Sequence, residues 1–136
     1  MTQLFQPDRP AGGSIEWYIA RKDRCLEQIW DVALRMLNTN CDVILELGLI
    51  QGESRRAMYQ RIEESGHKVL VYVLDAPREE RRERVRYRNL EKGSTFSMAV
   101  SDEIFEMASN MWEEPDEIEC TEQEVIFKTH TTAHYT

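Results

Sequence analysis

Apolar residues recur along the chain at helical and strand spacings, and these spacings divide it into predicted elements. Between residues 14 and 37 the apolar positions lie three and four apart, which predicts one long amphipathic helix. The same spacing predicts a helix over 52–64, which Gly66 should end. Two further helices are predicted, one over 77–89 with Pro77 at its first position and one that starts at Ser101.

Three short segments are predicted to be strands. They read DVILELG at 42–48, KVLVYVLD at 68–75 and EVIFKT at 124–129. The first run is almost continuously apolar, which suits a strand covered on both faces of a parallel sheet. With the helix over 52–64 it should form a right-handed βαβ unit with the strand at 68–75.

The order of these elements predicts an α/β fold, with a parallel sheet and flanking helices in three layers. We expect a single domain over residues 1–136, preceded within it by an irregular lead-in over 1–13 that carries two prolines and a Gly-Gly pair.

Composition narrows the classes of function. A hydrophobic content of 41% and a charged content of 31% are typical of a folded globular protein. The net charge of −8 argues against a nucleic-acid binder or a protein of anionic membranes, because both need a cationic surface. Three cysteines without a CxxC pair suggest reduced thiols, and the start lacks the features of a signal peptide, so the expected location is the cytoplasm.

One acid interrupts the predicted first strand. Glu46 lies near the carboxyl end of that strand, and this end faces the ligand crevice in open α/β sheets. It is therefore a candidate for organising magnesium or for acting as a general base. The alternative is a glutamate at a strand edge that reaches solvent or pairs with an arginine, and on residue type alone this alternative is the commoner case.

Arginines dominate the predicted helix that follows the second strand. Residues 78–88 hold six arginines interleaved with three glutamates, and Arg81, Arg84 and Arg88 share one helical face. The planar guanidinium grips phosphate oxygens in pairs, so this face suits a lid over a nucleotide. The alternative is a solvated helix with internal ion pairs such as Glu80 with Arg84. Arg55 should lie at the same edge of the sheet, and its alternative is an exposed first turn.

The loop that usually holds nucleotide phosphates is missing from the chain. That loop reads GxxxxGK[ST], with glycines that expose backbone amides and a lysine that reaches the outer phosphates. Gly48 and Gly52 bracket the residues LIQ, but no Gly-Lys pair follows them.

Several segments in a fixed order nevertheless resemble one known group. The segment DVILELG at 42–48 resembles the family pattern DVVLDxG, with Glu46 at the usual aspartate, and the arginine that follows falls on Arg55. The stretch 71–89 resembles the segment that leads to the family's R-V-x-x-R-N, and WEEPDEIE at 112–119 resembles a closing segment. The chain thus resembles kinase-like P-loop ATP-binding proteins, often labelled AAA-family ATPases, which are related to zeta toxins and chloramphenicol phosphotransferase.

The resemblance implies a P-loop NTPase-like fold without its first strand and phosphate loop. It also implies ATP and magnesium as cofactors and phosphoryl transfer to a small hydroxyl substrate. The residues it places in the site are catalytic Glu46, Arg84 and Arg88, with Glu46 also acting on magnesium indirectly, and phosphate- or substrate-binding Arg55, Arg81 and Asn89.

The missing strand would lie between the segments 42–48 and 68–75. These two either pair directly, or an N-terminal segment, a second copy of the chain or a separate partner fills the gap. Three hypotheses follow: a kinase that is weak or inactive because it lacks the loop, a non-catalytic interaction or dimerisation module derived from a kinase fold, and a nucleotide-binding protein without chemistry. The sequence does not identify the acceptor substrate.

Overall fold

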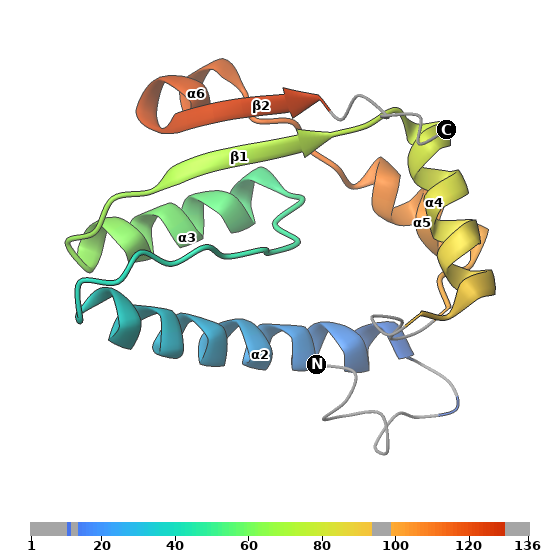
Figure 1. Ribbon diagram of the computed structural model, residues 1–136, viewed down its shortest axis with the longest axis horizontal. Helices are drawn as coiled ribbons and strands as arrows, with labels where there is room; N and C mark the ends of the chain where they lie inside the picture. The colour runs from blue at the N-terminus through green and yellow to red at the C-terminus, as the bar shows by residue number, and fades with distance from the viewer. Residues whose placement is uncertain (1–10, 12–13, 94–98, 130–136) are drawn as a thin grey trace. The chain divides into compact units, whose positions relative to one another are not determined.

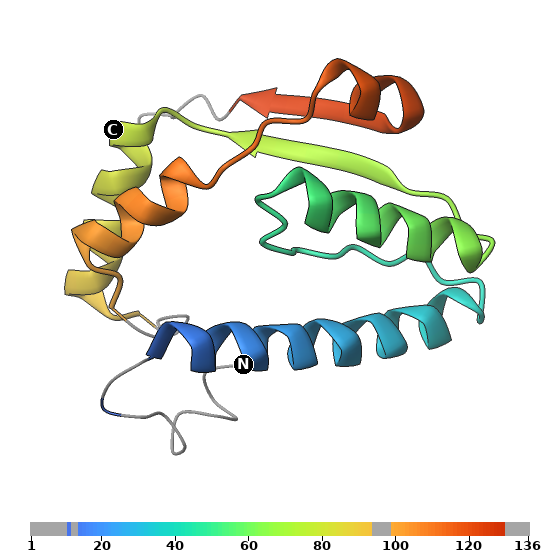
Figure 2. The same ribbon diagram turned by 180° about the vertical axis from the view of Figure 1, so that it is seen from behind.

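The computed structural model divides the chain into two compact units, Met1–Glu46 and Leu47–Thr136. The structure describes residues 11, 14–93 and 99–129. The predicted lead-in over 1–13 therefore lies outside the described residues, apart from residue 11. Figures 1 and 2 trace the elements of each unit.

The first unit contains one long helix. Helix α2 (Ser14–Leu37) confirms the helix predicted over the same residues, and Trp30 and Ala33 are its buried positions. Beyond its end, Asn40 takes a positive φ of 60° and the Thr39 hydroxyl donates a hydrogen bond to the Met36 carbonyl at 2.7 Å. Both features are typical of a polar helix end, where the last carbonyls need new donors.

The strand predicted over 42–48 is wrong. Residues 41–50 have no regular secondary structure, and the side chain of Ile44 is 93% exposed. A strand requires a neighbouring backbone to complete its hydrogen-bond ladder, and an apolar composition alone does not supply one. The predicted βαβ unit and the direct pairing of 42–48 with 68–75 are therefore also wrong in the described chain.

The second unit contains a parallel pair of strands. Strands β1 (Leu70–Asp75) and β2 (Glu124–Thr129) pair with Leu70 opposite Glu124 and Asp75 opposite Thr129. They confirm the strands predicted at 68–75 and 124–129, although β1 begins two residues later than expected. The α/β class is confirmed. The described residues contain a sheet of only two strands, so the three-layer arrangement stays a prediction.

Helix α3 (Gly52–Glu64) runs beside β1 (Figures 1 and 2). Met58 and Ile62 are buried on α3, and Val73 is buried on β1, whereas its neighbour Tyr72 on the opposite face of the strand is exposed. One face of β1 is thus covered and the other is not. The helix ends as predicted near Gly66, whose φ of 76° suits a residue without a Cβ.

The described part of the second unit also contains the helices α4 (Arg78–Glu91), α5 (Asp102–Asn110) and α6 (Glu117–Glu122). Pro77 caps α4 instead of forming its first turn, and the Ser101 hydroxyl caps α5 by accepting from the Ile104 amide at 3.3 Å. Helix α6 was not predicted, because its 6 residues are too few to show an apolar period. No helix in the described parts of the chain could cross a membrane, since none is both long and apolar enough.

Candidate functional site

Helix α4 begins at the carboxyl edge of the sheet. β1 ends at Asp75 and α4 starts three residues later at Arg78, while β2 runs parallel to β1 and ends at the same edge. In open α/β sheets this edge is where ligands bind. The arginine-rich helix is therefore placed where the sequence predicted it.

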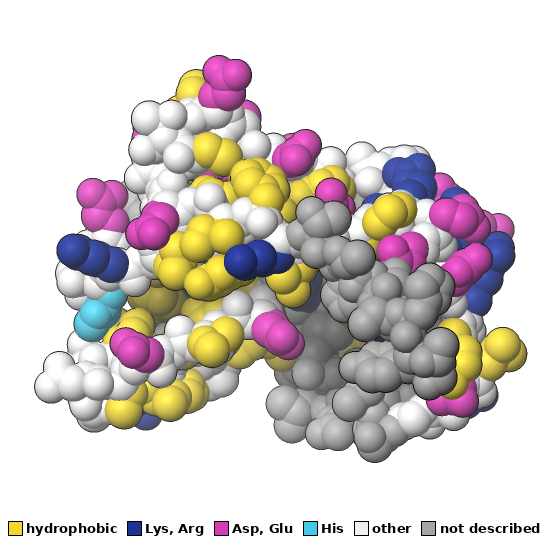
Figure 3. Space-filling model, turned by 45° about the horizontal axis from the view of Figure 1, so that its top comes forward, with side chains coloured by type: hydrophobic (Ala, Val, Ile, Leu, Met, Phe, Trp, Pro, Cys, Tyr) yellow, Lys and Arg dark blue, Asp and Glu magenta, His cyan; other side chains and the backbone are white. Residues whose placement is uncertain are grey.

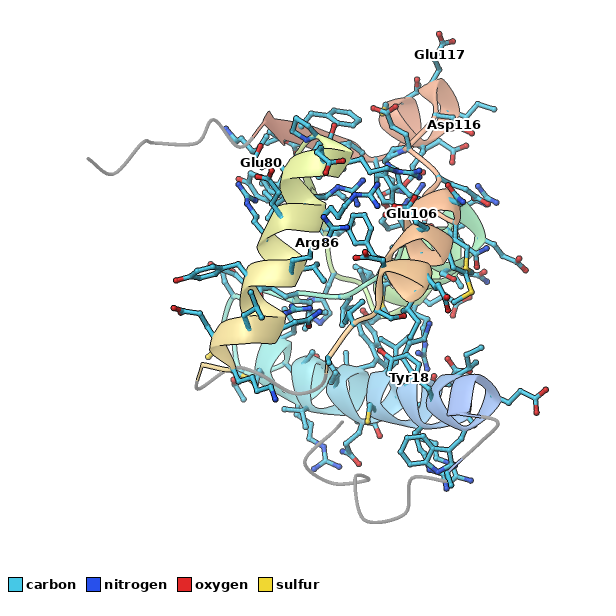
Figure 4. The ribbon with its side chains drawn as sticks, turned by 90° about the vertical axis from the view of Figure 1, so that its right-hand side faces the viewer. Tyr18, Glu80, Arg86, Glu106, Asp116 and Glu117 are labelled. Atoms are coloured by element: carbon cyan, nitrogen blue, oxygen red, sulfur yellow. The ribbon has the colours of Figure 1, made fainter. Side chains whose placement is uncertain are left out.

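One set of α4 arginines ties α4 to α5. Arg78 lies 3.2 Å from a Glu106 carboxylate oxygen, and Arg82 contacts the other oxygen of the same carboxylate. Arg86 donates to both oxygens of Asp102, at 3.2 and 2.7 Å. These arginines recur every four residues and so lie on one face of the helix, next to α5, as Figure 4 shows for Arg86 and Glu106.

The hydrogen bonds between the exposed side chains of Arg86 and Asp102 shift the pKa values of both groups. They lower the pKa of Asp102 and raise the pKa of Arg86. Both groups therefore stay charged near neutral pH. The pair lies in solvent, so it orients α5 more than it stabilises the fold.

Arg81 is also bound to protein groups. Its Nε donates to the Ala76 carbonyl at 3.1 Å and its Nη1 lies 3.5 Å from the Ser109 hydroxyl. The buried ring of Phe105 faces the guanidinium groups of Arg81 and Arg82, at 5.7 and 5.3 Å from the ring centre. Arg81 therefore helps to dock α5, and the phosphate contact that the sequence suggested for it stays a prediction.

The remaining predicted arginines of α4 are exposed. Arg84 pairs with Glu80, so the ion pair that the alternative interpretation named is present. Arg88 lies one turn further along and is also exposed. An exposed i to i+4 pair contributes only about 0.3–0.5 kcal/mol, so an anionic ligand can displace Glu80 at little cost.

Asn89 has a structural role that the sequence did not reveal. Its side-chain amide donates to the Val100 carbonyl at 2.7 Å and accepts from the Val100 amide at 3.0 Å. This clasp joins the end of α4 to the residue that precedes the α5 cap. The predicted contact of Asn89 with phosphate or substrate stays untested, and it would compete with this clasp.

Arg55 is buried, so the exposed first turn that was its alternative is wrong. Its Nε and Nη2 donate to the two carboxylate oxygens of Glu119 at 2.7 and 3.0 Å, and its Nη1 donates to the Leu49 carbonyl at 3.2 Å. The Tyr59 hydroxyl donates to the same Glu119 carboxylate at 2.7 Å. A bidentate pair of this kind is strong and geometrically specific. All three nitrogens of Arg55 thus have protein partners, and its predicted role in holding phosphate or substrate stays untested.

The environment of this buried cluster, Arg55 with Tyr59 and Glu119, keeps the ion pair charged. Burial alone would raise the pKa of Glu119, but the hydrogen bonds from Arg55 and Tyr59 outweigh it and lower that pKa. The hydrogen bond to Glu119 in turn raises the pKa of Arg55. Burial and the same carboxylate raise the pKa of Tyr59, so its hydroxyl stays protonated.

The carboxylate of Glu113, which belongs to the same segment 112–119 as Glu119, caps α3. The Gly52 amide donates to Glu113 Oε2 at 2.7 Å, and Arg55 lies over the Trp112 ring, 5.4 Å from its centre. A Cβ on Gly52 would come within 3.0 Å of Arg56 Nη1 and 3.2 Å of the Glu113 oxygen, so the ends of these two side chains would have to move by a few tenths of an ångström to admit it. The segment 112–119 thus holds the start of α3 through its acids.

Sequence reasoning assigned no role to Tyr59, Glu113 or Glu119. Glu113 and Glu119 lie in the segment WEEPDEIE, whose resemblance to a family segment was the only available signal. The contacts join residues 60 to 64 positions apart, and no local pattern reports such distances.

The lowered pKa of Glu119 predicts an acid-sensitive stability. Because the folded-state pKa lies below the unfolded value, the contribution of Glu119 is fully present above the unfolded pKa, near 4.5, and is lost as the pH falls through the folded pKa. Urea unfolding between pH 7 and 3 should show this loss, and a Glu119→Gln variant should lack that part of it. An equally steep decline in the variant would show that other carboxylates are responsible.

Glu46 is exposed and ends the first unit, whereas the predicted arginines belong to the second. Across the described residues, no group of three histidines, cysteines or acids is placed to hold a metal. Magnesium prefers six oxygen ligands and usually takes several of them from nucleotide phosphates and water. The described residues do not form a complete magnesium coordination site by themselves. The magnesium role of Glu46 stays a prediction.

Comparison with known proteins gives one match. The family model described as AAA domain matches residues 1–111 of the chain. No curated protein and no solved structure matches it.

Proposed function

We propose, since the chain belongs to the AAA domain family of P-loop nucleotide-binding proteins, that it binds the phosphates of ATP through Arg84 and Arg88. The observation that carries this proposal is the division of the α4 arginines. Arg78, Arg82 and Arg86 pair with acids of α5, whereas Arg84 pairs with Glu80 of its own helix and Arg88 is exposed, on a helix that starts at the ligand edge of the sheet.

The chemistry of these residues fits a phosphate chain. Guanidinium groups seven and eleven residues into α4 offer planar forks to phosphate oxygens and offset their charge. Glu80 would give up its pair with Arg84 as the anion arrives. In the wider proposal the fold derives from a phosphotransferase for small hydroxyl substrates, ATP supplies the transferable phosphoryl group, and Glu46 organises magnesium or the attacking hydroxyl.

The chain alone should not turn ATP over. Phosphoryl transfer depends on backbone amides and a lysine that cradle the outer phosphates, and the sequence has no GxxxxGK[ST] segment. A coupled assay for ADP release should therefore stay at the level of the blank. Measurable Mg·ATP turnover by the pure chain would contradict this expectation.

Calorimetric titration with Mg·ATP tests the binding proposal. The wild-type chain should bind in the micromolar range, and Arg84→Ala and Arg88→Ala should each weaken binding about tenfold, because each removes a charged hydrogen bond worth about 1.5 kcal/mol or more. Arg86→Ala is the matched control, since it removes the same charge from the same helix but from the side that faces Asp102.

The Arg86→Ala control distinguishes a specific phosphate site from a general effect of the net charge. If Arg86→Ala weakened binding as much as Arg84→Ala, net charge alone would explain the affinity and the proposed site would be wrong. No binding by the wild-type chain would also overturn the proposal. In that case the missing loop would be decisive.

A second candidate function is supported by one specific observation. Among the described residues β1 pairs with one other strand, β2, in a sheet of two strands. A chain that keeps a kinase-derived fold but offers an open sheet edge would serve as an interaction or dimerisation module. The oligomeric state distinguishes the two functions, because a stable monomer in solution would argue against the module.

A further inference from the structure

Two large apolar side chains of α4 lie open to solvent beside the proposed phosphate site. Tyr87 is 62% exposed and Leu90 is 82% exposed, whereas Val85, the one other apolar residue of this helix, is half-buried. Single exposed apolar residues are common on protein surfaces, so exposure alone assigns them no role. Their position relative to the arginines of α4 is what distinguishes them.

Helical spacing places Tyr87 next to Arg84. Tyr87 follows Arg84 by three positions and Arg88 follows it by four, and residues at both spacings are neighbours on a helix surface, about 5–6 Å apart at Cβ. Leu90 follows Tyr87 by three positions and extends the apolar side away from Arg88. Figure 3 shows basic and acidic side chains together at the right-hand side of the molecule, where Figure 1 labels α4, with hydrophobic side chains among them.

The hydroxyl of Tyr87 is held by an acid of the same helix. It hydrogen-bonds to the Glu91 carboxylate one turn further along, and this bond raises the pKa of Tyr87. The phenol therefore stays neutral near neutral pH. A ring that is already held at its outer end loses less conformational freedom when a ligand covers it.

We propose that the ring of Tyr87 stacks against the base of the nucleotide whose phosphates Arg84 and Arg88 hold. The inference rests on the proposed function and extends it to the part of the ligand that the arginines do not contact. A nucleotide joins its base to its phosphate chain through one sugar, so a single molecule can contact both the ring and the two neighbouring guanidinium groups. The ligand class is therefore nucleoside polyphosphates, and inorganic polyphosphate should bind more weakly.

Stacking distinguishes bases by their size more than by their identity. Every base has a π-face, so a base on an aromatic side chain is stabilised without hydrogen bonds to its edge. Purines offer a larger ring surface than pyrimidines. The expected order of affinity is ATP and GTP together, then CTP and UTP, and inorganic tripolyphosphate last.

Calorimetric titration of the 136-residue chain with the magnesium complexes of ATP and of tripolyphosphate tests the proposal. ATP should bind about tenfold more tightly, which is within the range measured for the stacking of one base. Tyr87→Ala should remove this difference by weakening ATP alone, and Tyr87→Phe should keep most of it because phenylalanine retains the ring. Tyr72→Ala is the matched control: it removes a tyrosine that is 55% exposed on β1, and it should leave both affinities unchanged.

Proton NMR supplies a readout that a purely structural role of Tyr87 would not change. The base protons of bound ATP should shift upfield with the wild-type chain, because they lie over an aromatic ring. The shift should persist with Tyr87→Phe and be absent with Tyr87→Ala. Far-UV circular dichroism checks that each variant is folded.

The outcomes separate the base contact from the phosphate site. Equal affinities of the wild type for ATP and tripolyphosphate, or a Tyr87→Ala variant that binds ATP like the wild type, would overturn the base contact and leave the phosphate site in place. Arg84→Ala should weaken the binding of both ligands. If it weakened neither, or if the wild type bound neither, the phosphate site would be wrong and this inference with it.

Discussion

Replacing Glu119 with glutamine is expected to lower the free energy of unfolding by about 3–5 kcal/mol, because it leaves the buried guanidinium of Arg55 without a counter-charge. Arg55 and Glu119 are both buried and share two hydrogen bonds, and Tyr59 donates a third to the same carboxylate. Urea unfolding followed by circular dichroism measures the change. A loss of this size is a large part of the stability of a small domain.

Two companion variants make the result specific. Glu117→Gln removes an exposed acid from the same helix, α6, and should change the stability by no more than about 0.5 kcal/mol. The double variant Arg55→Met with Glu119→Leu replaces the ion pair by apolar groups of similar volume and should recover much of the loss. If Glu119→Gln were as stable as the wild type, the pair would not hold α3 to α6.

Replacing Phe105 with alanine is expected to cost about 3–5 kcal/mol, since it leaves a cavity beneath two guanidinium groups. Phe105 is one of the few buried apolar side chains of the second unit, and it lies between α4 and α5 next to Arg81 and Arg82. Without the ring, the described contacts between the two helices would be polar: the ion pairs of Arg78, Arg82 and Arg86, and the contacts of Arg78 with Asn110 and of Arg81 with Ser109. Ion pairs near the surface contribute little each. Hydrogen exchange should therefore show lost protection across α5.

The control for Phe105 is its neighbour on the same helix. Ile104 is 40% exposed, so Ile104→Ala should cost far less and leave the protection of α5 in place. Equal effects of the two substitutions would mean that helix propensity, and not packing against α4, governs the loss.

These contacts change how the arginine-rich helix is interpreted. From the sequence, all its arginines are equivalent candidates for a nucleotide lid. In the folded chain Arg78, Arg82 and Arg86 pair with acids of α5, whereas Arg84 pairs with Glu80 of its own helix and Arg88 is exposed. The structure thus shortens the set of residues that mutagenesis should address first.

The predictions of helices and strands are confirmed where they rest on a local pattern of residues. The helix at Ser14–Leu37 and the strand at Glu124–Thr129 match the predictions, because apolar period, caps and β-branched content act within a few residues. The strand at 42–48 failed because its existence depends on a neighbour, and an apolar run carries no information on whether a neighbour is present.

The sequence by itself determined every described helix except α6, two of the three predicted strands and the membership of the AAA domain family, since each rests on patterns that can be read along the chain. Only the tertiary structure decided that Arg55 is buried against Glu119, that the Asn89 side chain hydrogen-bonds the Val100 backbone and that β1 pairs with β2 alone among the described strands. These features depend on contacts between residues that are far apart in the sequence. Tertiary packing determines those contacts, because a buried charge or an unpaired backbone group is stabilised only by the partner that the fold brings to it.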